Sequence, residues 1–235
     1  MDSMTAVAVR RKLLADVQAI PGVVAAARVN SRLFGTTAAQ LHVDGIDSVE
    51  VLGRFNMQIA TPDYFRVMRT GIVRGRAFTD ADRGGGPLVA VVSDAMARAL
   101  WPNKDPLGQC VHIGIGASAS AATAPCTTVI GIAENTAQQN ITDDPRFMYY
   151  LPVDQIVPHL LSTTYVRMSH SDVRGDLERV RRAVTHAMPA TASWSFIRCR
   201  TGSTIRAGRG GWPRRCSWRS ADWRLWWRSS GCTVW

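Results

Sequence analysis

Histidine and cysteine are the residues of this chain best suited to acid–base, metal or redox chemistry. The histidines are His42, His112, His159, His170 and His186, and each falls in a different part of the chain. The cysteines are Cys110, Cys126, Cys199, Cys216 and Cys232, and they include no C-x-x-C pair or other zinc-binding spacing. We therefore predict structural or surface roles for the histidines rather than a shared site.

Cys110 and Cys126 are the two cysteines that lie away from the C-terminal part of the chain. They could form a disulfide if this domain folds outside the cytoplasm, where disulfides persist. Two isolated thiols in a domain of this size are more often simply buried. The residues alone therefore favour two buried, unpaired thiols.

No nucleophile–base pair, metal-ligand spacing or phosphate-binding loop is evident in the sequence. Gly114-Ile115-Gly116 invites comparison with a nucleotide-binding loop, but no strand, loop and helix with a third glycine follow. The Ser, His and Asp residues also lack the motif context of a hydrolase. We therefore predict no catalytic residue, no metal ligand and no cofactor-binding residue, and a protein that is not an enzyme.

The elements that surround these residues can be predicted from hydrophobic pattern and capping residues. Between residues 61 and 108, Thr61-Pro62-Asp63 predicts the start of a short helix and Gly71 its end. The apolar run Leu88–Val92 predicts a buried strand, and Ser93 caps a helix over Asp94–Trp101 that Pro102 closes.

Other elements follow from the same signals. Thr5–Ile20 predicts an amphipathic helix with Arg10, Arg11 and Lys12 on its polar side. Strands are expected at Val23–Val29, Ala39–Asp44, Phe55–Ala60, Thr163–Met168 and Thr191–Ile197, and those at 39–44 and 55–60 are each expected to have one wet face. Ser171–Met188 predicts a helix with Val173, Leu177, Val180 and Val184 as its buried stripe, and residues 111–125 are expected to be largely flexible.

Several of these segments together resemble a known family. The pattern YF…G…GR.F…D, an apolar strand, and a helix ending in WPNKDPLG are followed by TTVIGIAENT (127–136), MYYLPVDQ (148–155) and TYVRMSHSD (164–172). In this order they resemble the MacB-like periplasmic core domain of FtsX/MacB-type ABC transporter permeases, over about residues 21–197. The resemblance implies an α+β, two-lobed domain over residues 1–205, with βαβ units and a mixed α/β lobe inserted at about residues 80–160.

The resemblance also implies a function. A domain of this family lies on the extracytoplasmic, periplasmic side of the cell inner membrane and transmits ATP-driven conformational change to export or mechanical work. The implied partners are an ABC ATPase subunit or domain, reached through membrane helices, and a second copy of the permease. We find no Walker loop, signal peptide or apolar run long enough to span a bilayer, so we expect a fragment without its membrane helices.

Residues 206–235 differ in character from the rest of the chain. They hold seven Arg, one Asp and six of the eight Trp, which accounts for most of the excess positive charge. Read one base earlier, their codons permit an apolar segment ending in GLYGV, so we expect a disordered or out-of-frame tail. Two alternatives remain open: a free-standing soluble binding module or non-functional permease fragment, and a basic nucleic-acid-binding protein. The interpretation as a permease domain involves no nucleic acid.

Overall fold

The computed structural model describes residues 3–30, 39–115, 120–136, 147–156, 163–169 and 173–187. Most of the helices and strands predicted above are present, with ends shifted by a few residues. The strands are β1 (Val23–Val29), β2 (Gln40–His42), β3 (Phe55–Ala60), β4 (Ile72–Gly75), β5 (Val89–Ser93), β6 (Cys110–Gly114), β7 (Cys126–Ala133), β8 (Phe147–Pro152) and β9 (Thr163–Met168). The helices are α1 (Ser3–Gln18), α2 (Tyr64–Met68), α3 (Asp94–Leu100), α4 (Val153–Ile156) and α5 (Val173–Ala187), with short 3-10 turns η1 (Val49–Leu52) and η2 (Ala121–Thr123).

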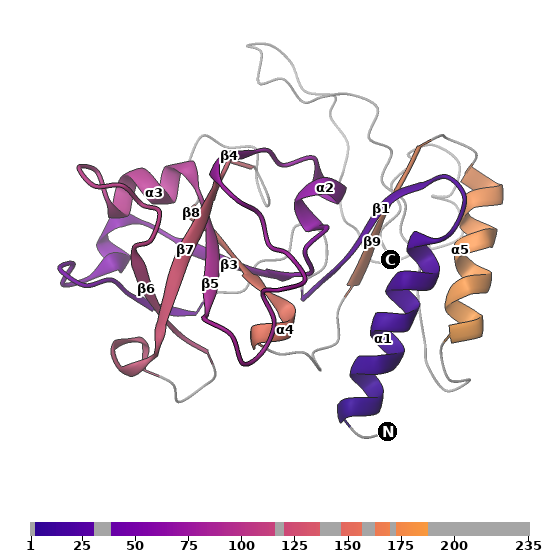
Figure 1. The fold of residues 1–235 in the computed structure, drawn as a ribbon. Helices are drawn as coiled ribbons and strands as arrows, with labels where there is room; N and C mark the ends of the chain where they lie inside the picture. The colour runs from indigo at the N-terminus through magenta and orange to yellow at the C-terminus, as the bar shows by residue number, and fades with distance from the viewer. Residues whose placement is uncertain are drawn as a thin grey trace, which may run out of the picture. The chain divides into compact units, whose positions relative to one another are not determined.

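The strands form one open, mixed sheet (Figure 1). Its main path runs β2, β6, β7, β5, β8, β3, β1, β9, and β4 pairs with β7 away from that path. Parallel pairing joins β5 to β7 and β3 to β8, whereas the other pairs are antiparallel. A mixed open sheet with helices packed on it confirms the predicted α+β class.

Strand β3 is buried along its whole length, which corrects the prediction of one wet face. Its polar residues Asn56 and Gln58 are only 4% and 3% exposed. The strand pairs with β8 on one side and β1 on the other, so it lies inside the sheet rather than at its edge. Gln58 is accommodated because its side-chain amide donates to Asn30 Oδ1 at 2.7 Å.

Helix α2 begins and ends at residues other than the predicted ones. Thr61 does not cap it: its Oγ1 accepts from the Arg28 amide at 2.9 Å, and its own amide donates to the Arg28 carbonyl. Thr61 therefore continues the pairing of β3 with β1, and the helix starts at Tyr64. Arg69, with φ of 58°, takes the left-handed position that was predicted for Gly71.

Strands β4, β6 and β8 were not predicted from the sequence. Residues 110–114 form β6, so the first part of the segment expected to be flexible is ordered by pairing with β2 and β7. Residues 72–75 form β4, which pairs with the end of β7. Strands β4 and β6 are short, and pairing with their neighbours defines them.

Helices α1 and α5 lie side by side next to the paired strands β1 and β9 (Figure 1). In α1 the predicted apolar side is confirmed, because Leu13 and Val17 are buried while Arg11 and Lys12 are exposed. Among the described side chains of α5, Val180 is buried. Within the described ranges, no helix is long and apolar enough to cross a membrane. The strand expected at 191–197 and the tail at 206–235 lie outside those ranges.

Candidate functional site

Several residues of the family pattern stabilise the described structure through side-chain hydrogen bonds and ion pairs. Arg76 follows β4 and makes two hydrogen bonds to Asp82, at 2.7 and 2.9 Å. The same carboxylate accepts from the Thr79 amide at 2.8 Å, and its side chain is only 7% exposed. The Arg76 hydrogen bonds are the main cause that lowers the pKa of Asp82 from 3.8 to about 2. The segment between β4 and β5 is therefore closed by a charged hydrogen-bonded pair.

Changing Asp82→Asn should destabilise the fold at neutral pH by about 1–2 kcal/mol, because the charged hydrogen bonds from Arg76 are weakened. The effect is no larger because the Arg76 side chain is half exposed and solvent screens its charge. The depressed pKa means that this stability is present above about pH 4 and is lost as pH falls toward 2. Urea unfolding at pH 7 and at pH 2.5 measures the difference, which should shrink at the lower pH. Asp80→Asn, at an exposed neighbouring carboxylate, is the control, and an equal loss in both variants would contradict the assignment.

Gln155, the last residue of the MYYLPVDQ segment, stabilises the start of β5 by hydrogen bonds to its backbone and to the residues just before it. Its Oε1 accepts from the Val89 amide at 3.1 Å, and its Nε2 donates to the Pro87 carbonyl at 2.8 Å. Ser93 fastens the other end of β5, because its Oγ accepts from the amides of Met96 and Met148 at 3.3 and 3.0 Å. The predicted cap of α3 is thereby confirmed, and it also joins α3 to β8.

Helix α1 is tied to the strands and to α4 by polar side chains. Arg11 forms an ion pair with Asp154 of α4 at 2.9 Å. Gln18 donates to Asp63 at 2.6 Å and to the carbonyl of Ala26 in β1 at 3.1 Å. Arg28 lies buried nearby, and burial, followed by repulsion from Arg10, lowers its pKa to about 10. The N-terminal helix is therefore connected to the sheet by charge and hydrogen bonding as well as by apolar packing.

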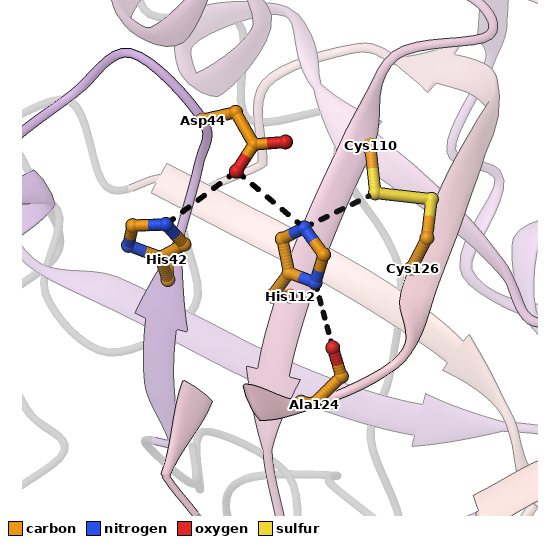
Figure 2. The surroundings of a disulfide bond; sticks show 6 residues. All are labelled: His42, Asp44, Cys110, His112, Ala124 and Cys126. Carbon is orange, nitrogen blue, oxygen red and sulfur yellow. Dashed lines mark hydrogen bonds and ion pairs between the residues drawn. A yellow bond between two sulfur atoms is a disulfide. The ribbon is translucent and has the colours of Figure 1, made fainter. Parts of the chain in front are cut away.

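A second group of polar side chains gathers on one face of β2, β6 and β7 (Figure 2). In the register of these strands, His42 is opposite His112, and His112 is opposite Cys126. Side chains two residues apart on a strand point to the same face, so Cys110 joins them. The intervening residues Val111, Ile113 and Thr127 are buried on the other face.

Cys110 and Cys126 form a disulfide in this group, with their Cα atoms 5.4 Å apart. This corrects the prediction of two buried, unpaired thiols, and Cys126 is in fact exposed. The pairing follows from the β6–β7 register, which places the two residues diagonally across neighbouring strands. The residues alone could not supply that register.

His42 and His112 also come together, which corrects the prediction that each histidine stands apart. Their ring centroids are 5.8 Å apart. Asp44 Oδ1 lies 3.5 Å from His42 Nε2 and 3.8 Å from His112 Nε2, and Cys110 Sγ lies 3.5 Å from the same His112 nitrogen (Figure 2). His186 is exposed in the last turn of α5, while His159 and His170 lie outside the described residues.

The only sequence signal for this group was the alternation in QLHVD and CVHIG, where polar and apolar residues take turns. That pattern places each histidine on the face opposite the core, but it does not say which strands are neighbours. Across the described ranges, no set of three or more His, Cys, Asp or Glu side chains could hold a metal ion. The group consists of a disulfide with two imidazoles and a carboxylate beside it.

A family described as the MacB-like periplasmic core domain matches residues 2–197. The crystal structure of the periplasmic region of MacB from Actinobacillus actinomycetemcomitans is similar, with a TM-score of 0.54, 14% identity, and coverage of 74% of this chain and 72% of that chain. The crystal structure of the extracellular domain of the noncanonic ABC-type transporter YknZ from Gram-positive bacteria is also similar. Its TM-score is 0.51 at 16% identity, and the match covers 74% of this chain and 81% of that chain. No curated protein matches.

The mixed open sheet is therefore the fold that this chain shares with these periplasmic and extracellular domains. The identities to the solved structures are low and show the shared fold alone. The family match covers most of the chain, and the chain belongs to the MacB-like periplasmic core domain family. The resemblance inferred from the sequence is confirmed.

Proposed function

We propose that this domain lies outside the cytoplasmic (inner) membrane as part of an ABC transporter permease and transmits ATP-driven movement to export or mechanical work. The partner in this proposal is an ABC ATPase subunit or domain, reached through membrane helices, and two permease copies act together. In this transport role the domain is not an enzyme and needs no cofactor. Membership of the family is the observation that carries the proposal.

The arrangement of α1 and α5 supports this role. These helices come from the two ends of the described part of the chain, yet they pack against each other. Strands β1 and β9, which adjoin them in sequence, pair along six positions of the sheet. A domain inserted between two membrane helices needs its entry and exit close together, and this packing supplies that.

The ion pair between Arg11 and Asp154 is a place where a movement of α1 relative to α4 can be measured. It joins α1 to α4, which directly follows strand β8 of the sheet. We infer that a displacement of α1 by the membrane helices changes its distance from α4. The two side chains are 55% and 32% exposed, so reagents in solution can reach them.

The test is cross-linking of Arg11→Cys/Asp154→Cys in the full-length permease, in whole cells, with a membrane-impermeant bis-maleimide. The matched control is Lys12→Cys/Asp16→Cys, a pair of similar exposure, 66% and 34%, four residues apart within α1. We expect both pairs to react from outside the cell. The yield of the first pair should change when ATP hydrolysis is blocked, whereas the yield of the control should stay constant.

The outcomes separate the parts of the proposal. If neither pair reacts until the membrane is permeabilised, the extracytoplasmic location is wrong. If both react but the Arg11/Asp154 pair does not respond to the nucleotide state, the domain lies outside the membrane without transmitting movement through α1. That second result would favour a binding module.

A further inference from the structure

We propose that the Cys110–Cys126 disulfide is a thiol–disulfide exchange site, in which an external thiol attacks Cys126 and His112 assists the departure of Cys110. The co-reactant is a low-molecular-weight thiol or the active-site dithiol of an oxidoreductase. The proposal rests only on the geometry of the side chains around the disulfide, on the face of β2, β6 and β7 described above. It is independent of the transport role.

The two sulfur atoms differ in their surroundings. Cys126 begins β7 and its side chain is exposed, whereas Cys110 begins β6 and is half-buried. An incoming thiolate must approach one sulfur in line with the disulfide, so access decides which sulfur is attacked. The exposed Cys126 is the sulfur that solution thiols can reach, and Cys110 is then the leaving group.

The orientation of His112 suits it to assist that leaving group. Its Nδ1 lies 2.7 Å from the carbonyl oxygen of Ala124. A carbonyl only accepts hydrogen bonds, so Nδ1 carries a proton and donates it. Nε2 is the nitrogen left to face Cys110 Sγ, at 3.5 Å. When the imidazole is protonated, Nε2 donates toward this sulfur.

The other charged and titratable groups beside His112 are Asp44 and His42. The Asp44 carboxylate lies 3.8 Å from Nε2 of His112. It also lies 3.5 Å from His42 Nε2, so it serves both rings. His42 is joined to Asp44 and not to either sulfur (Figure 2), which makes it a useful comparison.

The exchange step balances as an ordinary thiol–disulfide reaction. The external thiolate forms a new S–S bond to Cys126 Sγ, and the Cys110–Cys126 bond breaks with its electron pair going to Cys110 Sγ. The Cys110 thiolate then accepts a hydrogen bond, or the proton, from His112 Nε2. A second external thiol resolves the mixed disulfide, releasing Cys126 as a thiolate and the oxidised reagent, so the domain gains two electrons.

The test uses the full chain with Cys199, Cys216 and Cys232 changed to Ser, so that only the pair reacts. The oxidised protein is treated briefly with reduced glutathione, alkylated, and mapped by tandem mass spectrometry. We expect glutathione on Cys126 and the alkyl group on Cys110. Glutathione on Cys110 would overturn the direction of attack. Reaction only after denaturation would show a purely structural cross-link.

The role of His112 is tested by the rate of the same reaction. His112→Gln should slow exchange with glutathione by about tenfold, because the leaving Cys110 thiolate loses the positively charged imidazolium that donates a hydrogen bond to it. His42→Gln should leave the rate within about twofold. Equal rates in all three proteins would overturn the assisting role. The mapping experiment retains the native histidine, so it remains decisive even if the His112 variant folds poorly.

Discussion

Gly131→Ala is expected to reduce the free energy of unfolding by about 3–5 kcal/mol. A Cβ at residue 131 would lie 2.2 Å from the carbonyl oxygen of Arg76. Gly131 is the register partner of Gly75, where β4 approaches β7. The contact is with backbone, so no side-chain rotation can relieve it, and the strands would have to separate.

Gly75 and Gly85 allow the clash to be separated from backbone strain. At Gly75 the added Cβ would meet the Ile130 carbonyl oxygen at 2.3 Å, and φ is +73°. At Gly85 φ is +89°, but nothing lies within 4 Å of the added atom. Gly85→Ala should therefore lose only the left-handed penalty of about 1–2 kcal/mol. Urea unfolding of the three alanine variants measures whether Gly131→Ala and Gly75→Ala lose more stability than Gly85→Ala. A Gly131→Ala loss no greater than that of Gly85→Ala would contradict the close approach of β4 and β7 at Gly131.

Ser93→Ala is the second change for which we expect a large effect, a loss of about 2–4 kcal/mol in the free energy of unfolding. Ser93 is fully buried, and its Oγ accepts from two backbone amides, those of Met96 and Met148. Removing the oxygen leaves both buried donors without this acceptor. It weakens the start of α3 and the junction of α3 with β8 in a single step.

Ser120→Ala is the matched control for Ser93→Ala. Ser120 also precedes a helical turn, η2, but its side chain makes no capping hydrogen bond there. Its substitution should change the unfolding free energy by less than about 0.5 kcal/mol. Similar losses for the two variants in thermal or urea unfolding would show that the shared contact of Ser93 with α3 and β8 does not stabilise the fold.

Elements defined by local signals were predicted correctly from the sequence. The strand β5, the Ser93 cap and helix α3 follow one another within a few residues, and each carries its own signal. Helices α1 and α5 were likewise recognisable from their spacing of apolar residues. In these segments the physical cause lies in neighbouring residues, so an ordered list of motifs was enough to identify the family.

Features that depend on strand neighbours were predicted less well. Thr61 and Gly71 look like helix ends, yet Thr61 instead extends the pairing with β1, and the Gly71 amide donates to Glu134. Strand β3 alternates as if half-exposed, but all six of its residues are buried, so both of its faces are covered by other parts of the protein. In each case a contact from a distant part of the chain displaced the local preference.

The sequence by itself determined the family, the α+β class and the order of the locally signalled elements. Only the tertiary structure decided that His42, His112, Cys110 and Cys126 share one face and that the two cysteines pair. The physical reason is register. Alternation within a strand fixes the face on which each side chain lies, whereas contact between β2, β6 and β7 is made across loops whose closure no local residue pattern encodes.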